Sequence, residues 1–201
     1  MAEKSREFRI VRNEYDKNIE KTKFFPEGIA SIEFDVNLKN YDGDTVMTSV
    51  YHVDSKSESV PVEIKVVDNV AKIFFNNQGN LLREGMYEVR VKTSEEKTFK
   101  IPFVMAVPIK KDQEFWDLKF KVNNRNKNEK LVNQILNTQV QFLNLDSRSL
   151  ILNKDVKLNT SSPMGMRLQN NKDAWTEGRY ELRITKAKNN ELIFQRFYIV
   201  K

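Results

Sequence analysis

The chain has 201 residues, with 34 Lys plus Arg against 28 Asp plus Glu, one His and no Cys. Without Cys, disulfides, thiolate metal sites and thiol catalysis are excluded. His52 is the single His, so a multi-His metal site is impossible and any imidazole-dependent nucleophile would have to rest on that residue. With 39% hydrophobic residues, the chain is expected to form one or two packed domains.

The chain has the pattern of short β-strands separated by turns. Apolar and polar residues alternate over 32–38, 86–91 and 179–184, which is the period-2 pattern of a half-buried strand. Further strands are predicted at 46–53, 60–67, 70–75, 99–107, 118–122, 140–145, 164–168 and 192–200. No long helical pattern is present to connect parallel strands, so the sequence predicts an antiparallel β-sandwich with short helical insertions at 81–83 and 128–137.

An internal repeat divides the chain into two units. Glu84-Gly-Met-Tyr-Glu-Val-Arg-Val91 reappears 93 residues later as Glu177-Gly-Arg-Tyr-Glu-Leu-Arg-Ile184. A weaker match relates 8–18 to 118–128. We therefore predict two tandem β-sandwich domains, 1–108 and 109–201, which meet at the Pro-containing and charged segment 108–114.

The repeated motif has a structural and a catalytic interpretation. In the catalytic one, Glu84 and Glu177 are paired carboxylates; no other catalytic residue types accompany them, so we favour the structural one. There the glycines allow a turn, Tyr87 and Tyr180 enter the core, and the following Glu88 and Glu181 face water. A Tyr at this place is typical of immunoglobulin-like sandwiches.

Two other segments are also interpreted as structural. Asp42-Gly-Asp44 contains two carboxylates that calcium could use, but the EF-hand spacing is absent and a hairpin turn is favoured. His52 lies within a strand pattern, so we expect a satisfied or surface histidine there rather than a catalytic one.

Positive charge is concentrated in the second unit. Residues 1–108 contain 16 basic and 18 acidic residues, a net of −2, whereas residues 109–201 contain 18 basic and 10 acidic residues, a net of +8. The basic residues considered as partner-binding candidates are Lys119, Lys121, Arg148, Lys154 and Lys157. Nucleic-acid binding would require exposed aromatics to stack bases, so a face that docks an acidic protein or a polyanionic polymer is favoured.

The stretches 62–75, Glu84–Val91 and Phe99–Val104 together resemble the N-terminal domain of bacteriophage baseplate upper proteins. The resemblance covers roughly residues 28–107 and, through the repeat, 138–201. It implies immunoglobulin-like sandwiches that mount receptor-binding proteins on the tails of phages infecting Gram-positive bacteria. The chain departs from the family pattern in having two units in tandem and in lacking the long helical segment that usually follows.

These observations predict a non-enzymatic virion structural protein, in the tail, baseplate or another attachment position, that needs no cofactor. It would act by docking to other virion proteins in a homo- or hetero-oligomeric assembly. Phe115, Trp116 and Trp175 are the candidate anchors, the first two also because aromatics at a junction often pack domains together. Trp175 falls opposite Leu82 in the repeat, so a place in the core is the favoured interpretation of that residue. The alternatives are a module that binds polyanionic cell-wall polymer or carbohydrate, and a non-specific nucleic-acid-binding protein. No secretory signal or membrane span is expected, so the protein would be made in the host cytoplasm.

Overall fold

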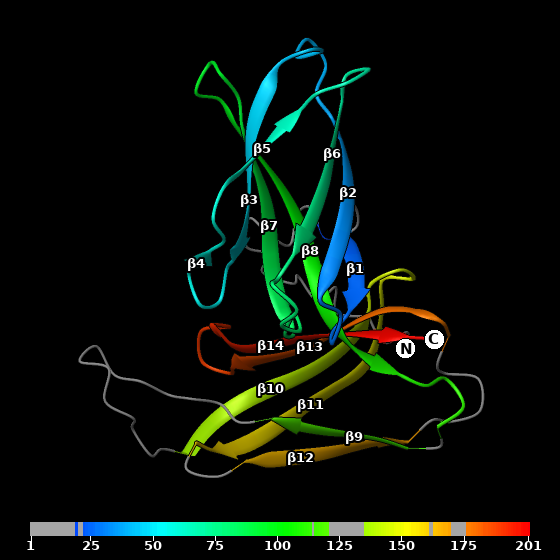
Figure 1. Ribbon diagram of the computed structural model, residues 1–201. Helices are drawn as coiled ribbons and strands as arrows, with labels where there is room; N and C mark the ends of the chain where they lie inside the picture. The colour runs from blue at the N-terminus through cyan, green and yellow to red at the C-terminus, as the bar shows by residue number, and fades with distance from the viewer. Residues whose placement is uncertain (1–18, 20–21, 114, 121–134, 161–162, 170–175) are drawn as a thin grey trace, which may run out of the picture.

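The computed structural model describes residues 19, 22–113, 115–120, 135–160, 163–169 and 176–201. This part of the chain is all-β and contains no α-helix (Figure 1). The strands are β1 (Lys23–Pro26), β2 (Ser31–Asn37), β3 (Thr45–His52), β4 (Ser57–Glu58), β5 (Val62–Lys65), β6 (Val70–Asn76), β7 (Gly85–Lys92), β8 (Thr98–Ile109), β9 (Phe115–Phe120), β10 (Ile135–Asn144), β11 (Ser149–Asn159), β12 (Met164–Gln169), β13 (Gly178–Lys186) and β14 (Leu192–Val200).

The strands form one large sheet and two small ones. The large sheet has the order β11-β10-β13-β14-β8-β7-β3-β4, with β1 also paired to β8 and β5 also paired to β3. The small sheets are β2-β6, which packs over the first half of the large sheet, and β9-β12, which packs over the second half (Figure 1). The predicted all-β sandwich architecture is thus confirmed.

The first core lies between β2-β6 and strands β3, β7 and β8. Phe34 and Ile73 of the small sheet meet Val89 and Phe103 of the large sheet, and all four are buried. Strand β2 alternates buried apolar with exposed polar residues along its length, because successive side chains point to opposite faces. The predicted alternation of apolar and polar residues over 32–38 is therefore confirmed: the apolar residues of β2 face the core and the polar residues are exposed.

The second core lies between β9-β12 and strands β10, β11, β13 and β14. Trp116 and Leu168 of the small sheet pack against Phe142 and Tyr180 of the large sheet. The Trp116 ring meets the Phe142 and Tyr180 rings edge-on, with centroids 6.2 and 6.0 Å away. The aromatic rings are the largest contributors to apolar burial in this core.

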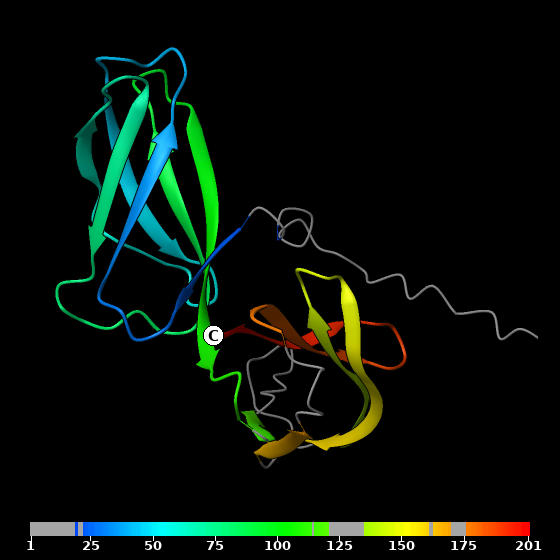
Figure 2. The same cartoon turned by 90° about the vertical axis from the view of Figure 1, so that its right-hand side faces the viewer.

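Strand β8 runs from one core to the other. It pairs antiparallel with β7 along Thr98–Met105, and its last residues pair in parallel with β14, Val107 opposite Tyr198 and Ile109 opposite Val200. Figure 2 shows this long green strand leaving the first sandwich and descending toward the second. The domain boundary predicted between residues 108 and 109 falls at the end of this strand and stays a prediction.

Several local predictions were wrong. Residues 81–83 form neither a helix nor a strand, and 135–137 belong to strand β10, while 128–134 lie outside the described residues. Asp42-Gly-Asp44 is indeed a turn, in which the amide of Asp44 donates to the carbonyl of Tyr41 at 3.1 Å. It is not a hairpin, however, because it links β2 to β3, which belong to different sheets.

Replacing Phe103 by Ala is expected to lower the free energy of unfolding by about 3–5 kcal/mol, because the ring is fully buried and its removal leaves a cavity. Phe74→Ala is the matched control, since Phe74 is 60% exposed and its loss should cost less than about 1 kcal/mol. Urea denaturation of both variants measures the difference. Equal losses would contradict the placement of Phe103 in the core.

Candidate functional site

The repeated Glu-Gly-x-Tyr-Glu motif forms the same structure at the start of β7 and of β13. The hydroxyl of Tyr87 donates to the carbonyl of Arg83 at 3.0 Å, and that of Tyr180 donates to the carbonyl of Thr176 at 2.7 Å. Both tyrosines are buried, as predicted. Each bond reaches back four residues, as in the tyrosine corner of immunoglobulin-like sandwiches.

The two glycines of the motif each lie under an aspartate from a neighbouring turn. Gly85 and Gly178 have φ values of +141° and +148°, which side chains rarely allow. A Cβ at either position would lie 2.6 Å from the Oδ2 of Asp54 or Asp146, respectively. Asp146 Oδ2 also accepts the amide of Arg179 at 2.8 Å. The glycines are therefore required by backbone conformation and by close packing together.

The prediction that the glutamates after the tyrosines face water is wrong. Glu88 and Glu181 are 5% and 2% exposed. Each is paired with the arginine two residues along its own strand, Arg90 at 3.0 Å and Arg183 at 2.5 Å. Side chains two residues apart in a strand share a face, so the arginine supplies the charge and hydrogen bonds that make burial of the carboxylate tolerable.

The outer faces of the two sandwich halves pack on each other in a third apolar cluster, which we call the junction cluster. Its buried members are Ile19, Met86, Val104, Ala106 and Phe197. The Phe24 ring of β1 meets the Phe197 ring of β14 edge-on, with centroids 5.5 Å apart. Residues from both halves of the repeat are therefore in contact here.

Two arginines of the second half add polar links at the junction. Arg196 of β14 forms an ion pair with Glu84, with its Nη2 2.6 Å from Oε1 of the carboxylate. Arg179 of β13 donates from Nη1 to the carbonyls of Ile19 and Thr22, at 3.2 and 3.0 Å. Neither link carried a signal in the sequence, because the partners of each are more than a hundred residues apart.

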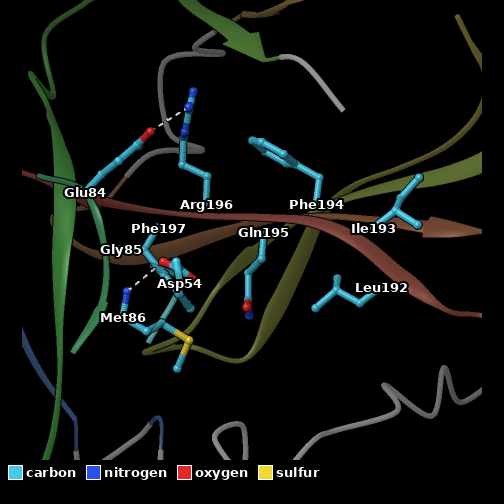
Figure 3. Close-up of a pocket in the computed structure, with 10 residues that line it drawn as sticks. All are labelled: Asp54, Glu84, Gly85, Met86, Leu192, Ile193, Phe194, Gln195, Arg196 and Phe197. Atoms are coloured by element: carbon cyan, nitrogen blue, oxygen red, sulfur yellow. Dashed lines mark hydrogen bonds and ion pairs between the residues drawn. The ribbon is translucent and has the colours of Figure 1, made fainter. Parts of the chain in front are cut away.

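A pocket of about 340 Å³, the junction pocket, opens beside the junction cluster (Figure 3). One wall is the Leu192–Phe197 part of β14, which precedes the three residues of β14, Tyr198 to Val200, that pair with β8. The opposite wall is Asp54 with Glu84–Met86. The pocket is thus lined by segments of both halves.

The carboxylate of Glu84 is incompletely compensated. Its Oε2 is buried and has no hydrogen-bond partner among the described residues. Burial raises the pKa of Glu84, with the nearby charges of Glu27 and Asp54 adding to the rise, while Arg196 opposes it. Burial also raises the pKa of the neighbouring Tyr198 phenol to about 12.

His52 is the last residue of β3, and its ring contacts Tyr87, Ser55 and Asp54. Its ring stacks on Tyr87 with centroids 4.4 Å apart, and its Nδ1 lies 2.6 Å from the Ser55 hydroxyl. Its Nε2 is 3.6 Å from the Asp54 carboxylate. The Nδ1 therefore has a partner, whereas the Nε2 is buried and has no hydrogen-bond partner among the described residues. The predicted satisfied histidine is thus confirmed for one ring nitrogen alone.

The predicted aromatic anchors differ in their exposure. Trp116 is 2% exposed and packs within the second core rather than between the halves, so it is not available as a surface anchor. Phe115 is 39% exposed on the outside of β9. Lys121 and Trp175 lie outside the described residues, and Lys119 lies in β9.

The remaining basic candidates do not gather on one face. Lys154 and Lys157 are exposed on β11. They are three residues apart, so alternation directs them to opposite sides of the sheet. Arg148 lies in the turn before β11, with φ +58°. Among the basic candidates that the structure describes, Lys154 and Lys157 therefore do not share one face of the sheet.

Within the described residues, no three His, Cys, Asp or Glu side chains are grouped as a metal ion would require. In the same part of the chain, no helix has the length and apolar character needed to cross a membrane.

The sequence matches no protein-family model and no curated protein. Among solved structures, the chain is similar to a trypsin-activated alpha-2-macroglobulin from Escherichia coli, with 8% identity and a TM-score of 0.34 over 88% of this chain. It is also similar to dimeric latent PorU from Porphyromonas gingivalis, with 13% identity and a TM-score of 0.28 over 89% of this chain. The chain spans only 15% and 19% of the length of those two chains.

Substituting Ala for Gly85 or Gly178 is expected to lower the free energy of unfolding by about 1–3 kcal/mol, because the new Cβ meets both an unfavourable φ and an aspartate oxygen. Gly165→Ala is the matched control, since that glycine has no atom within 4 Å of an added Cβ and no positive φ. Thermal and urea unfolding compare the three variants. A Gly85→Ala or Gly178→Ala protein as stable as Gly165→Ala would show that the close approach is not structurally required.

The ionisation of Glu84 is expected to reduce stability as pH rises. The pKa of Glu84 in the folded state lies above its unfolded value, so the folded state favours the protonated carboxyl. The resulting contribution of Glu84 to the free energy of unfolding is fully present below about pH 4.5, and it is lost as pH rises through the folded-state pKa. Glu84→Gln should therefore gain stability relative to the natural chain between pH 4 and pH 7. The urea midpoints of both proteins, measured across this pH range, test the prediction. A variant that becomes less stable than the natural chain as pH rises would contradict it.

Proposed function

We propose that the chain is a non-enzymatic structural protein that works by docking to other proteins in a bacteriophage particle, in its tail, baseplate or another attachment position. The observation that carries the proposal is the junction between the two sandwich halves. Strand β8 is continuous through it, and the junction cluster buries apolar residues of both halves. A chain built in this way presents its outer surfaces at a fixed spacing, which suits a connector between neighbouring proteins.

The outer face of β9-β12 supports docking as the mode of action. Phe115 is exposed there, and the Arg167 guanidinium lies over its ring, 5.2 Å from the centroid. Arg167 also donates two hydrogen bonds to the Asp117 carboxylate, at 2.7 and 3.0 Å. An aromatic ring and an arginine that are already oriented by neighbours are the residue types that dominate binding energy at protein interfaces.

The proposed setting in a virion is supported by the sequence resemblance to baseplate upper proteins and by the sandwich architecture. An immunoglobulin-like sandwich carries many functions, so the fold alone does not select this one. Mass spectrometry of purified particles of the phage that encodes the chain tests the setting directly. The chain is expected among the particle proteins. Its absence from particles, together with no binding to any particle protein, would contradict the proposal.

Phe115→Ala is expected to weaken binding to the neighbouring particle protein by about tenfold or more, because it removes the exposed ring of the proposed anchor. Phe74→Ala removes an exposed ring from the first half and is expected to leave binding unchanged. Sedimentation of both variants with particles that lack the natural chain measures the effect. If both variants bind like the natural chain, the docking surface is not the outer face of β9-β12.

A further inference from the structure

We propose that the junction pocket binds a lysine or arginine side chain of a partner protein, with the cation beside Asp54 and Glu84. This inference rests on the docking function proposed above, and it names the chemistry of a second contact. The pocket lies on a different part of the molecule from Phe115, which belongs to the outer face of β9.

The pocket has the size and wall composition of a side-chain site. Its volume of about 340 Å³ lies within the range of small-ligand pockets. The apolar part of its lining consists of Met86, Leu192, Ile193, Phe194 and Phe197. Figure 3 shows Glu84 extended toward Arg196 and Asp54 beside Met86. The site therefore combines apolar walls with two carboxylates.

The charge of the pocket favours a cation. Two carboxylates, Asp54 and Glu84, line it together with one guanidinium, Arg196. A third carboxylate, Glu27, lies close enough to act on the charge of Glu84. The Oε2 of Glu84 has no partner in the described part of the chain, and the Glu84–Arg196 ion pair uses only Oε1. The excess negative charge is thus built into the site.

The raised pKa of Glu84 agrees with this charge balance. Burial is the largest cause of the raised pKa of Glu84, and the charges of Glu27 and Asp54 add to it, while Arg196 opposes it. A second cation would complete the compensation. Lysine and arginine side chains carry such a cation on an apolar stem, and this matches carboxylates next to apolar walls.

Nuclear magnetic resonance titration of the full-length chain tests the proposal with a defined probe. The probe is the N-acetyl, C-methylamide derivative of lysine with its Nζ free, and the neutral control is the same derivative of norleucine. The lysine probe is expected to shift the amide resonances of Gly85, Met86 and Gln195 in a saturable manner, and the norleucine probe is expected to shift them far less. The corresponding glutamate derivative is expected to cause no shift there.

Asp54→Asn and Glu84→Gln are each expected to weaken binding of the lysine probe about two- to fivefold, in line with the loss of one partly exposed ion pair. Asp44→Asn, in the turn between β2 and β3, is the matched control and should bind like the natural chain. Two variants are used because Asp54 also accepts the amide of Met86, at 3.4 Å, and its loss alone could disturb the fold.

Equal shifts with lysine and norleucine, shifts with glutamate, or unchanged binding in both pocket variants would overturn the proposal. The outcome is separable from the proposed function. Binding of the lysine probe with no chain in particles would contradict the virion role alone, whereas a chain present in particles that does not bind the probe would contradict the pocket alone.

Discussion

The arrangement of both halves depends on the way in which the edge of strand β8 is shared. Its central residues Phe103–Ala106 are buried on both faces, so their backbone groups must be hydrogen-bonded within the protein. One edge is taken by β7, while the other is taken first by β1, as far as Ala106, and then by β14 from Val107 onward. Since β14 belongs to the second half, its backbone pairing with the last residues of β8 fixes the second half against the first.

Successive side chains of β8 and β14 point to opposite faces, so each strand contributes to the core of its own half and to the junction cluster. On β8, Phe103 and Met105 enter the first core, while Val104 between them enters the junction cluster. On β14, Tyr198 enters the second core and Phe197 the junction cluster. Strands buried on both faces are expected to be continuously apolar rather than alternating. The run from Ile101 to Pro108 is therefore a consequence of the junction.

The sequence predicted those parts of the fold that depend on one buried face or on a repeated motif, such as strand 32–38 and the paired tyrosines. It did not predict β1, because four residues are too few to show a period, or β11, in which exposed lysines interrupt the pattern. It placed Glu88 and Glu181 in water, because burial there depends on pairing with arginines on the same face. The ion pair of Glu84 with Arg196 joins segments 112 residues apart, for which one sequence offers no local signal.

The junction shows how two copies of one motif acquire different roles. Met86 and Arg179 occupy the same position after the repeated glycine, and both are at the junction. Met86 contributes apolar surface, whereas Arg179 binds the carbonyls of Ile19 and Thr22. The pKa of Glu84 is raised despite its ion pair with Arg196. The ionised form of that carboxylate is therefore not favoured by its surroundings within the chain, and this supports the proposal that Glu84 recognises a cation of a partner.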